Sequence, residues 1–366
     1  MRHRLLGVLV LLLALLLPVP AATATGTAAS AVSATGPQVY GAWHCSNDAC
    51  TWGTVRTIAE FDSMNHWLID RGDGRPSVNL VVLSFVEPLK LLHRTNDATT
   101  VDGLPRGITP EIVQYFTSRG IRVMLSIGGI TYTDEWDAAL SENAAQLGLN
   151  AADAATRLGV GIEIDYEQNT NPNLAGLQTF IDTYRSRHPY DASGADQRAR
   201  LTIDTAAGDR WLIGINRKAT ADWLRTDVPV LDYANAMVPA RQPSASGAIA
   251  NWQEHLDGKS TYSPPVLPLA PAKFTAGLYI SDQTKSLPEC TAFANSLQKS
   301  TGSFTQTAAP HGAGTTAGLL GYMFWAAERP STRGTGTQPP NTCEGGVGAG
   351  ATAYSIPLPM PPLRQN

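Results

Sequence analysis

Eight short, mostly apolar segments recur along this chain at intervals of roughly 30 to 45 residues, which is the length of one strand-helix unit of a (β/α)8 barrel. Most of them are continuously apolar instead of alternating with polar residues, as expected for parallel strands covered on both faces. We predict strands at residues 39–43, 78–85, 121–127, 160–166, 200–204, 231–238, 274–280 and 319–325.

Helical patterns lie between these segments. Thr109 and Pro110 have the residue types of a helix N-cap and first helical position. Residues 137–147 are rich in helix-forming types, and residues 174–187 repeat apolar side chains at helical spacing. We therefore predict an α/β fold, a single-domain (β/α)8 TIM barrel. An open doubly wound sheet is the alternative, but its G-x-G-x-x-G turn does not follow the first segment.

The start of the chain has the features of a secretory signal peptide over residues 1–24. Arg2 and Arg4 precede an apolar run at residues 5–17, which is short for a bilayer span, and Ala22-Thr-Ala24 offers a cleavage site. An uncleaved anchor is the alternative. We predict a flexible leader at 25–36, the barrel at 37–330 and a Gly/Pro-rich tail packed on it at 331–366. The protein is thus expected to be secreted and extracellular, with no membrane partner after cleavage.

The net charge and the cysteine content indicate which partners, disulfides and cofactors to expect. The formal net charge is −4 and no basic cluster occurs, so we expect no nucleic acid partner. Four cysteines in an exported chain indicate two disulfides, for which three connectivities exist. Cys45 and Cys50 are close in a polar loop, which leaves Cys290 with Cys343. No Cys/His spacing resembles a zinc site, so we expect neither metal nor cofactor.

Three carboxylates, Glu163, Asp165 and Glu167, alternate with apolar residues in the fourth predicted strand. Residues two apart in a strand point to one face, so all three acids crowd one wall. Neighbouring negative charges raise one another's pKa, which prepares a general acid. A buried structural ion-pair network is the alternative, although the strand itself contains no Lys or Arg.

Two motifs on consecutive strands resemble glycoside hydrolase family 18, the chitinases and endo-β-N-acetylglucosaminidases. Ser126-Ile-Gly128-Gly129 is similar to the family's S-x-G-G, and residues 160–167 are similar to its D-G-x-D-x-D-x-E signature. The resemblance implies that Glu167 is the general acid and base. Asp165 would orient and stabilise the substrate's acetamido group, and Glu163 would tune the pKa of its neighbours. Ser126 and the two glycines would support them from the adjacent strand.

The resemblance also implies a substrate and a mechanism. The expected substrate is an N-acetylglucosamine-containing polysaccharide or glycan, first chitin or chitooligosaccharides, cleaved at β-1,4 bonds with retention. The acetamido oxygen of the substrate would act as the nucleophile, which makes this family an exception to the two-carboxylate scheme. The interval 281–318 has no room for the inserted domain of many relatives, so we expect a shallow, open groove and endo-type cleavage. We also expect a monomer.

The sequence departs from the family pattern in two places. Val160 and Glu163 stand where the signature has Asp. Met237-Val-Pro-Ala240 lacks the tyrosine that usually follows the sixth-strand Met. We therefore nominate several sugar contacts: Trp325 as a stacking surface with core packing as its alternative, and Met237, Tyr233, Asn235 and Tyr279.

Three alternative functions stay open. The first is an endo-β-N-acetylglucosaminidase acting on N-glycans, and the second is an impaired barrel that binds N-acetylated glycans. The third is a two-carboxylate glycosidase. The last of these requires a nucleophile on another strand, for which Asp204 or Asp209 is available but no motif supports them.

Overall fold

The computed structural model describes residues 38–44, 52–71, 73–207, 212–237, 245–279, 319–325, 327 and 356–361. The predicted signal peptide and leader, all four cysteines, the interval 281–318 and most of the tail lie outside these residues. The predictions made for them stay predictions.

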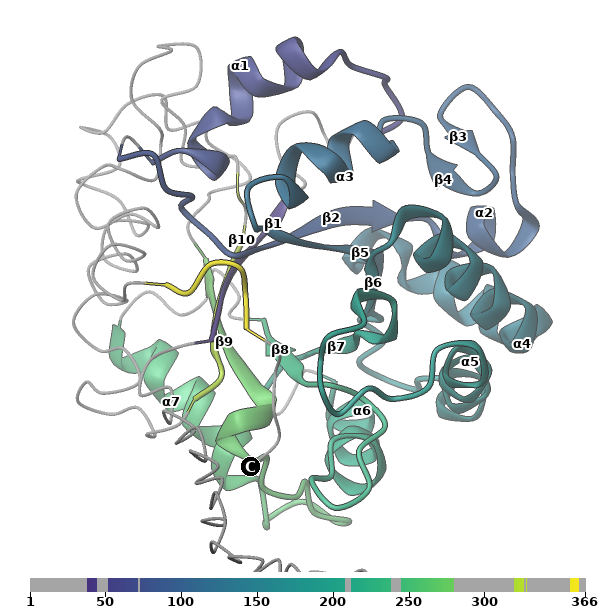
Figure 1. Cartoon of the computed structure of the whole chain (residues 1–366). Helices are drawn as coiled ribbons and strands as arrows, with labels where there is room; N and C mark the ends of the chain where they lie inside the picture. The colour runs from purple at the N-terminus through teal and green to yellow at the C-terminus, as the bar shows by residue number, and fades with distance from the viewer. Residues whose placement is uncertain are drawn as a thin grey trace, which may run out of the picture. The chain divides into compact units, whose positions relative to one another are not determined.

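The eight predicted strands form a closed parallel barrel (Figure 1), as the sequence indicated. Around the ring the strands follow the order β1-β10-β9-β8-β7-β6-β5-β2, and β1 pairs with both β10 and β2 to close it. The strands are β1 (Val39–His44), β2 (Leu80–Val86), β5 (Arg122–Gly128), β6 (Gly161–Asp165), β7 (Leu201–Thr205), β8 (Ala234–Ala236), β9 (Phe274–Tyr279) and β10 (Gly321–Trp325).

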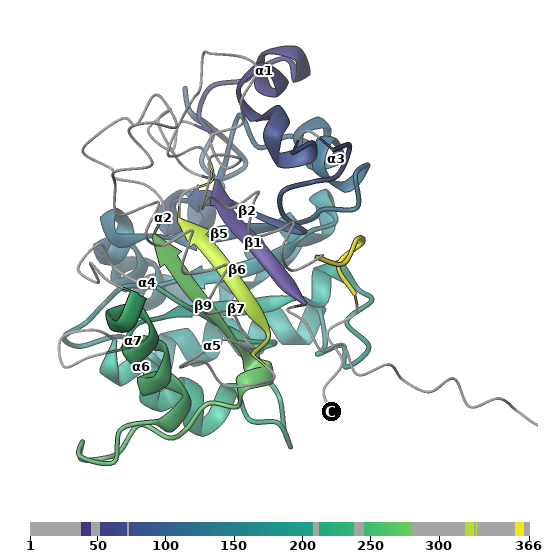
Figure 2. The same cartoon turned by 90° about the vertical axis from the view of Figure 1, so that its left-hand side faces the viewer.

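Helices cover the outside of this ring, as Figure 2 shows for α6 and α7. A small antiparallel pair, β3 (Thr100–Val101) and β4 (Leu104–Pro105), was not predicted. The helices are α1 (Ile58–Ile69), α2 (Pro88–His93), α3 (Pro110–Thr117), α4 (Thr133–Leu158), α5 (Leu174–Arg187), α6 (Ile213–Lys218) and α7 (Ala245–Asp257), with short turns η1 (Ile130–Tyr132), η2 (Gln197–Ala199), η3 (Ala219–Trp223) and η4 (Pro271–Lys273). None of the described helices is long and apolar enough to cross a bilayer.

Local sequence explains where two of these helices begin and end. The Thr109 side chain accepts a hydrogen bond from the Ile112 amide, and Pro110 occupies the first turn of α3, as predicted. Helix α4 is longer than the predicted 137–147. It runs on to Leu158 through a non-helical residue, Asn143, and stops at Gly159, which adopts a left-handed conformation.

Side chains on the two faces of the barrel wall form two separate apolar clusters. The outward faces pack under the helices and make the main core. The inward faces close the amino-terminal end of the barrel with an apolar floor, to which the tail contributes Met360. This floor consists of Val39, Trp43, Leu80, Val82, Met124, Tyr233, Leu320, Met323 and Met360. The opposite end, where the strands finish, carries the acids.

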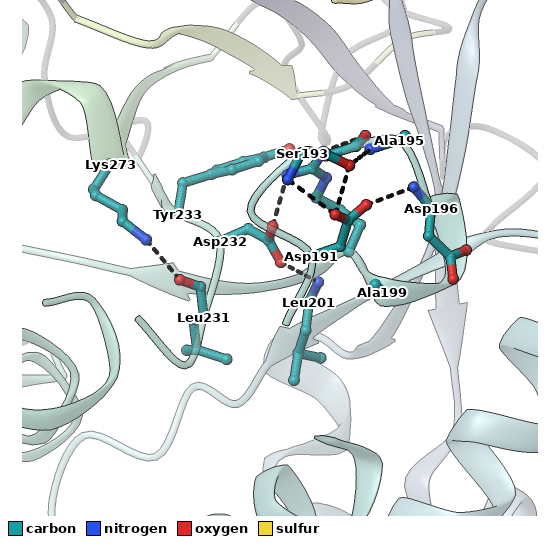
Figure 3. Close-up of polar contacts among 12 residues, drawn as sticks. Asp191, Ser193, Ala195, Asp196, Ala199, Leu201, Leu231, Asp232, Tyr233 and Lys273 are labelled. Atoms are coloured by element: carbon teal, nitrogen blue, oxygen red, sulfur yellow. Dashed lines mark hydrogen bonds and ion pairs between the residues drawn. The ribbon is translucent and has the colours of Figure 1, made fainter. Parts of the chain in front are cut away.

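A polar network fastens the starts of β7, β8 and β9 below the floor (Figure 3). Asp232 accepts hydrogen bonds from the Leu201 amide at 2.8 Å and from Arg200 Nη1 at 2.7 Å. Lys273 Nζ donates to the Leu231 carbonyl at 3.0 Å. These contacts align the first residues of three strands along the barrel axis. The alignment of the strand starts in turn determines how far each strand reaches towards the site at the other end.

Candidate active site

The three acids of β6 lie at increasing height in the barrel. Glu163 pairs in register with Ser126 of β5, and Asp165 pairs with Gly128 one step higher. Glu163 is fully buried, Asp165 is 3% exposed, and Glu167 is only half-buried. Strand β6 ends at Asp165, so Glu167 lies two residues beyond it, towards the mouth of the barrel.

Glu163 is held by side chains from two other strands, and a third strand orients one of them. Trp43 Nε1 of β1 donates to Glu163 Oε1 at 2.7 Å, and Asn235 Nδ2 of β8 donates to Oε2 at 2.6 Å. Thr275 Oγ1 of β9 donates to Asn235 Oδ1 at 2.5 Å, which orients the amide. Burial raises the pKa of Glu163 to about 7, although the hydrogen bonds from Trp43 and Asn235 act in the opposite direction.

Asp165 is the acid with the fewest partners. Burial raises its pKa well above the usual range, and the neighbouring carboxylates of Glu167 and Glu163 raise it further. Its Oδ1 has no hydrogen-bond partner among the described residues. A buried carboxyl oxygen without a partner is costly in a folded protein, so this side chain is prepared to hold a proton or to bind a polar group.

Glu167 sits where a general acid is needed. Burial raises its pKa to about 7, while a hydrogen bond from the Ile130 amide lowers it. The loop after Glu167 is anchored to α4, because Gln168 Nε2 donates to Asp137 Oδ2 at 2.7 Å and the Tyr166 hydroxyl also donates to Asp137. The acid therefore stands on a rigid support.

Glycines of the S-x-G-G motif make room for this arrangement. Gly128 has φ +116° and Gly129 has φ +91°, both outside the range that L side chains ordinarily adopt. A Cβ on Gly128 would lie 2.0 Å from the Asp165 carbonyl oxygen and 2.2 Å from Trp136 Nε1. That indole instead donates to the Asp165 carbonyl at 3.1 Å. Only glycine allows β5, β6 and α4 to meet here.

The predicted sugar contacts separate into two groups. Trp325, partly buried at the mouth, stacks on Phe85 with ring centroids 5.7 Å apart and an interplanar angle of 25°. Met237 is also partly buried. Tyr233, in contrast, lies in the floor with its hydroxyl 4.0 Å from Met124 Sδ, and Asn235 is bound to Glu163. Only the backbone of Tyr279 is described.

Three side chains of the site were missed or misassigned from sequence. Trp43 and Thr275 were not identified as neighbours of the acids, and Asp204 was named only as an alternative nucleophile. Asp204 is 1% exposed and pairs in register with Asn235. Asp209 lies outside the described residues. Across those residues, His, Cys, Asp and Glu form no group that could hold a metal.

Comparison with known proteins identifies the fold. A chitinase of glycoside hydrolase family 18 from Pseudoalteromonas aurantia superposes with a TM-score of 0.53 at 14% identity, over 86% of this chain and 99% of that one. The chain shares the barrel fold of family 18 chitinases. A chitinase from Rhizomucor miehei (TM-score 0.46, 13% identity, 79% and 94% coverage) and a chitinase-like agglutinin from Robinia pseudoacacia (0.46, 12%, 86% and 99%) also match.

The likeness to family 18 chitinases is one of architecture. No protein-family model matches the sequence, and no curated protein matches it. The structural likeness therefore shows the barrel fold.

Proposed function

We propose that this chain is a secreted glycoside hydrolase that cleaves β-1,4 bonds next to N-acetylglucosamine with retention of configuration. One observation carries the proposal: the acids of β6 are ordered by depth, and the outermost, Glu167, has a pKa raised to about 7 by burial. A carboxyl group with that pKa near the mouth of a barrel holds a proton at neutral pH and can donate it.

Each acid has a distinct task in this mechanism. Glu167 protonates the glycosidic oxygen, and the substrate's own acetamido oxygen attacks the anomeric carbon. Asp165 binds the acetamido group with its Oδ1, which has no hydrogen-bond partner among the described residues, and stabilises the charge that develops there. Glu167 then acts as base and activates water. Glu163 stays below them as part of the support.

An aromatic surface beside the acids suits a sugar ring. Trp325 and Phe85 form a stacked pair at the ends of β10 and β2. Pyranose rings bind to such flat apolar faces through their C–H groups, while the hydroxyls stay in water. We assign this surface to the sugar next to the cleaved bond.

The substrate is proposed to be chitin or chitooligosaccharides. The test compares a chitooligosaccharide with an N-glycan core, using the wild-type protein, Glu167→Gln and the surface control Glu142→Gln. Hydrolysis of the chitooligosaccharide that only Glu167→Gln abolishes supports the proposal. Cleavage of the N-glycan core alone would instead make the protein an endo-β-N-acetylglucosaminidase.

A sugar-binding barrel without turnover is the second candidate, and the position of Tyr233 favours it. This tyrosine, directly before β8, contacts Met124 in the floor, so its hydroxyl does not hold an acetamido group beside Asp165. Titration calorimetry with chitooligosaccharides distinguishes the two candidates. Binding that Glu167→Gln leaves unchanged, with no product after long incubation, would replace the enzyme proposal by this one.

Export is part of the proposal and has its own test. Residues 1–24 are proposed to be removed during secretion, after which Cys45–Cys50 and Cys290–Cys343 form and the protein acts as a monomer. Mass spectrometry of the extracellular product would give its first residue and its disulfide pairing. A product that retains residues 1–24 and fractionates with membranes would contradict this part alone.

A further inference from the structure

Near its start, helix α4 holds the chain on both sides of Glu167. Asp137 of this helix accepts a hydrogen bond from the Tyr166 hydroxyl and, on its other carboxyl oxygen, one from Gln168 Nε2 at 2.7 Å. Tyr166 and Gln168 are the residues directly before and after Glu167. A single carboxylate on a helix outside the barrel therefore fixes both neighbours of the proposed acid.

The direction of each of these hydrogen bonds is determined by a further contact. The Tyr166 hydroxyl accepts from the Asn173 amide at 2.8 Å, which leaves its own proton for Asp137. The Gln168 side-chain oxygen accepts from the Thr170 amide at 3.1 Å, so the side-chain nitrogen faces Asp137. Both donors are neutral, and Asp137 receives them on separate oxygens, as a carboxylate does.

The same part of α4 also holds the residue below. Trp136, directly before Asp137 and fully buried, donates to the Asp165 carbonyl at 3.1 Å. The Gly129 amide donates to that carbonyl at 2.9 Å. The backbone is thus fixed two residues before Glu167 as well as on either side of it.

A break in α4 separates this segment from the rest of the helix. Asn143 has non-helical angles, φ −162° and ψ 78°, and its side chain accepts from the Gln146 amide at 3.0 Å, as an N-cap does. Residues 133–142 therefore form a short helix that can differ in direction from residues 144–158. Its contacts with the end of β6 can orient it.

We infer that Asp137 is a positioning residue for the proposed general acid. It keeps residues 166–168 in one conformation, so that the Glu167 carboxyl group stays half-buried at the mouth of the barrel. Asp137 acts through its two neighbours and not on the substrate. The effect on turnover rests on the proposed function, whereas the position of Glu167 depends on these hydrogen bonds alone.

The position of Glu167 also preserves its proton. Burial raises the pKa of Glu167 to about 7, so a loop that moved outwards would expose the carboxyl group and lower that pKa. In the described part of the chain, Asp165 on β6 and Asp204 on β7 are the acids that interact with the charge of Glu167. A substitution at position 137 alters neither of them.

Four variants test the effect on turnover of a chitooligosaccharide. Asp137→Asn leaves one of the two donors without an acceptor, and Gln168→Met removes one donor without changing the charge. Asp137→Asn combined with Gln168→Glu restores the charge and reverses the direction of the hydrogen bond. Asp134→Asn removes an exposed charge from the same helix as a control.

The two single variants at positions 137 and 168 should lower kcat about 10- to 100-fold and keep KM within about threefold, because they misplace the acid without removing a substrate contact. The double variant should recover kcat to within about threefold of the wild type, and Asp134→Asn should match the wild type.

Two results would overturn the inference. One is a kcat within about threefold of the wild type in both single variants with only Tm lowered, which would leave Asp137 a purely structural role. The other is a double variant that unfolds at the wild-type Tm and yet does not recover kcat. Asp137→Asn and Gln168→Met decide by themselves if the double variant does not fold.

Carbon-13 NMR of the glutamate carboxyl groups tests the position of Glu167 without any substrate. Its resonance is the one missing from Glu167→Gln, and in the wild type it should titrate at about pH 7. The midpoint should move to lower pH in Asp137→Asn and Gln168→Met and return in the double variant. Midpoints that stay in place in both single variants would refute the positioning role. Because this measurement needs no turnover, it stands apart from any failure to find a glycan substrate.

Discussion

Trp43 on the first strand of the barrel donates its indole N–H to the carboxyl group of Glu163, 2.7 Å away on the other side of the barrel interior. The two residues are 120 positions apart in sequence. This hydrogen bond links the apolar floor, to which the Trp43 ring belongs, to the lowest of the acids. It makes the charge on Glu163 a property of the closed barrel and not of β6 alone.

Replacement of Trp43 by Phe should lower the free energy of unfolding by about 1.5–3 kcal/mol, because it removes a hydrogen bond to a charged group. Denaturant unfolding above pH 7, where Glu163 is mostly ionised, measures the change. The matched control is Trp52→Phe, which removes an indole bond of 3.2 Å to the neutral His44 carbonyl and should cost about 0.5–1.5 kcal/mol. Equal losses in the two variants would show that Glu163 is uncharged.

The pH dependence of hydrolysis should follow the proton on Glu167. Burial raises the pKa of this acid to about 7, so kcat/KM should fall as pH rises through about 7. Glu167→Gln should remove about 10²- to 10⁴-fold of activity together with that limb of the profile. Glu142→Gln, an exposed residue that pairs with His93, should leave both unchanged. An alkaline limb that survives in Glu167→Gln would assign the proton to another group.

Stability should fall as pH rises from about 5 to about 8. Glu163 and Glu167 have folded-state pKa values of about 7, above the usual value of 4.5, so between these values the folded chain binds more protons than the unfolded chain. Stability decreases with pH wherever that holds. We expect Tm to drop by roughly 5 °C or more across this range. Glu163→Gln should make the drop smaller, and an unchanged slope in that variant would refute the assignment.

Alanine substitutions at Gly128 and Gly159 separate the cost of steric overlap from the cost of backbone strain. Both have positive φ, but a Cβ on Gly159 meets nothing within 4 Å, whereas a Cβ on Gly128 overlaps the Asp165 carbonyl. Gly159→Ala should cost about 1–2 kcal/mol from backbone strain alone. Gly128→Ala should cost about 3 kcal/mol or more and disturb the acids as well. Similar costs, measured by denaturant unfolding, would mean that the neighbours of Gly128 shift easily.

Much of the barrel was predictable because its strands are long apolar runs between clear helix signals. Strand β9 begins at the predicted Phe274, and α5 matches the predicted 174–187. The hairpin of β3 and β4 was missed because two-residue strands have no periodicity to detect.

The site was predictable along β6 and at the Ser126–Gly129 motif of the neighbouring strand. The alternation of Glu163, Asp165 and Glu167 follows from the two-residue period of β structure. The contacts of Trp43 and Asn235 with Glu163 depend instead on the relative levels of separate strands, which the pairing register determines. Spacing along the chain contains no information on that register, so Asn235 was taken for a sugar contact and Trp43 was not identified.

The ring closes where β1 pairs with β10, so the first and last strands of the wall must find each other late in folding. Trp43 belongs to that seam. An intermediate with seven strands in place would have nearly all of the native secondary structure, yet Glu163 would lack one of its donors. Recovery of the site during refolding should therefore lag behind recovery of helix and strand, and the lag would report the time at which the seam forms.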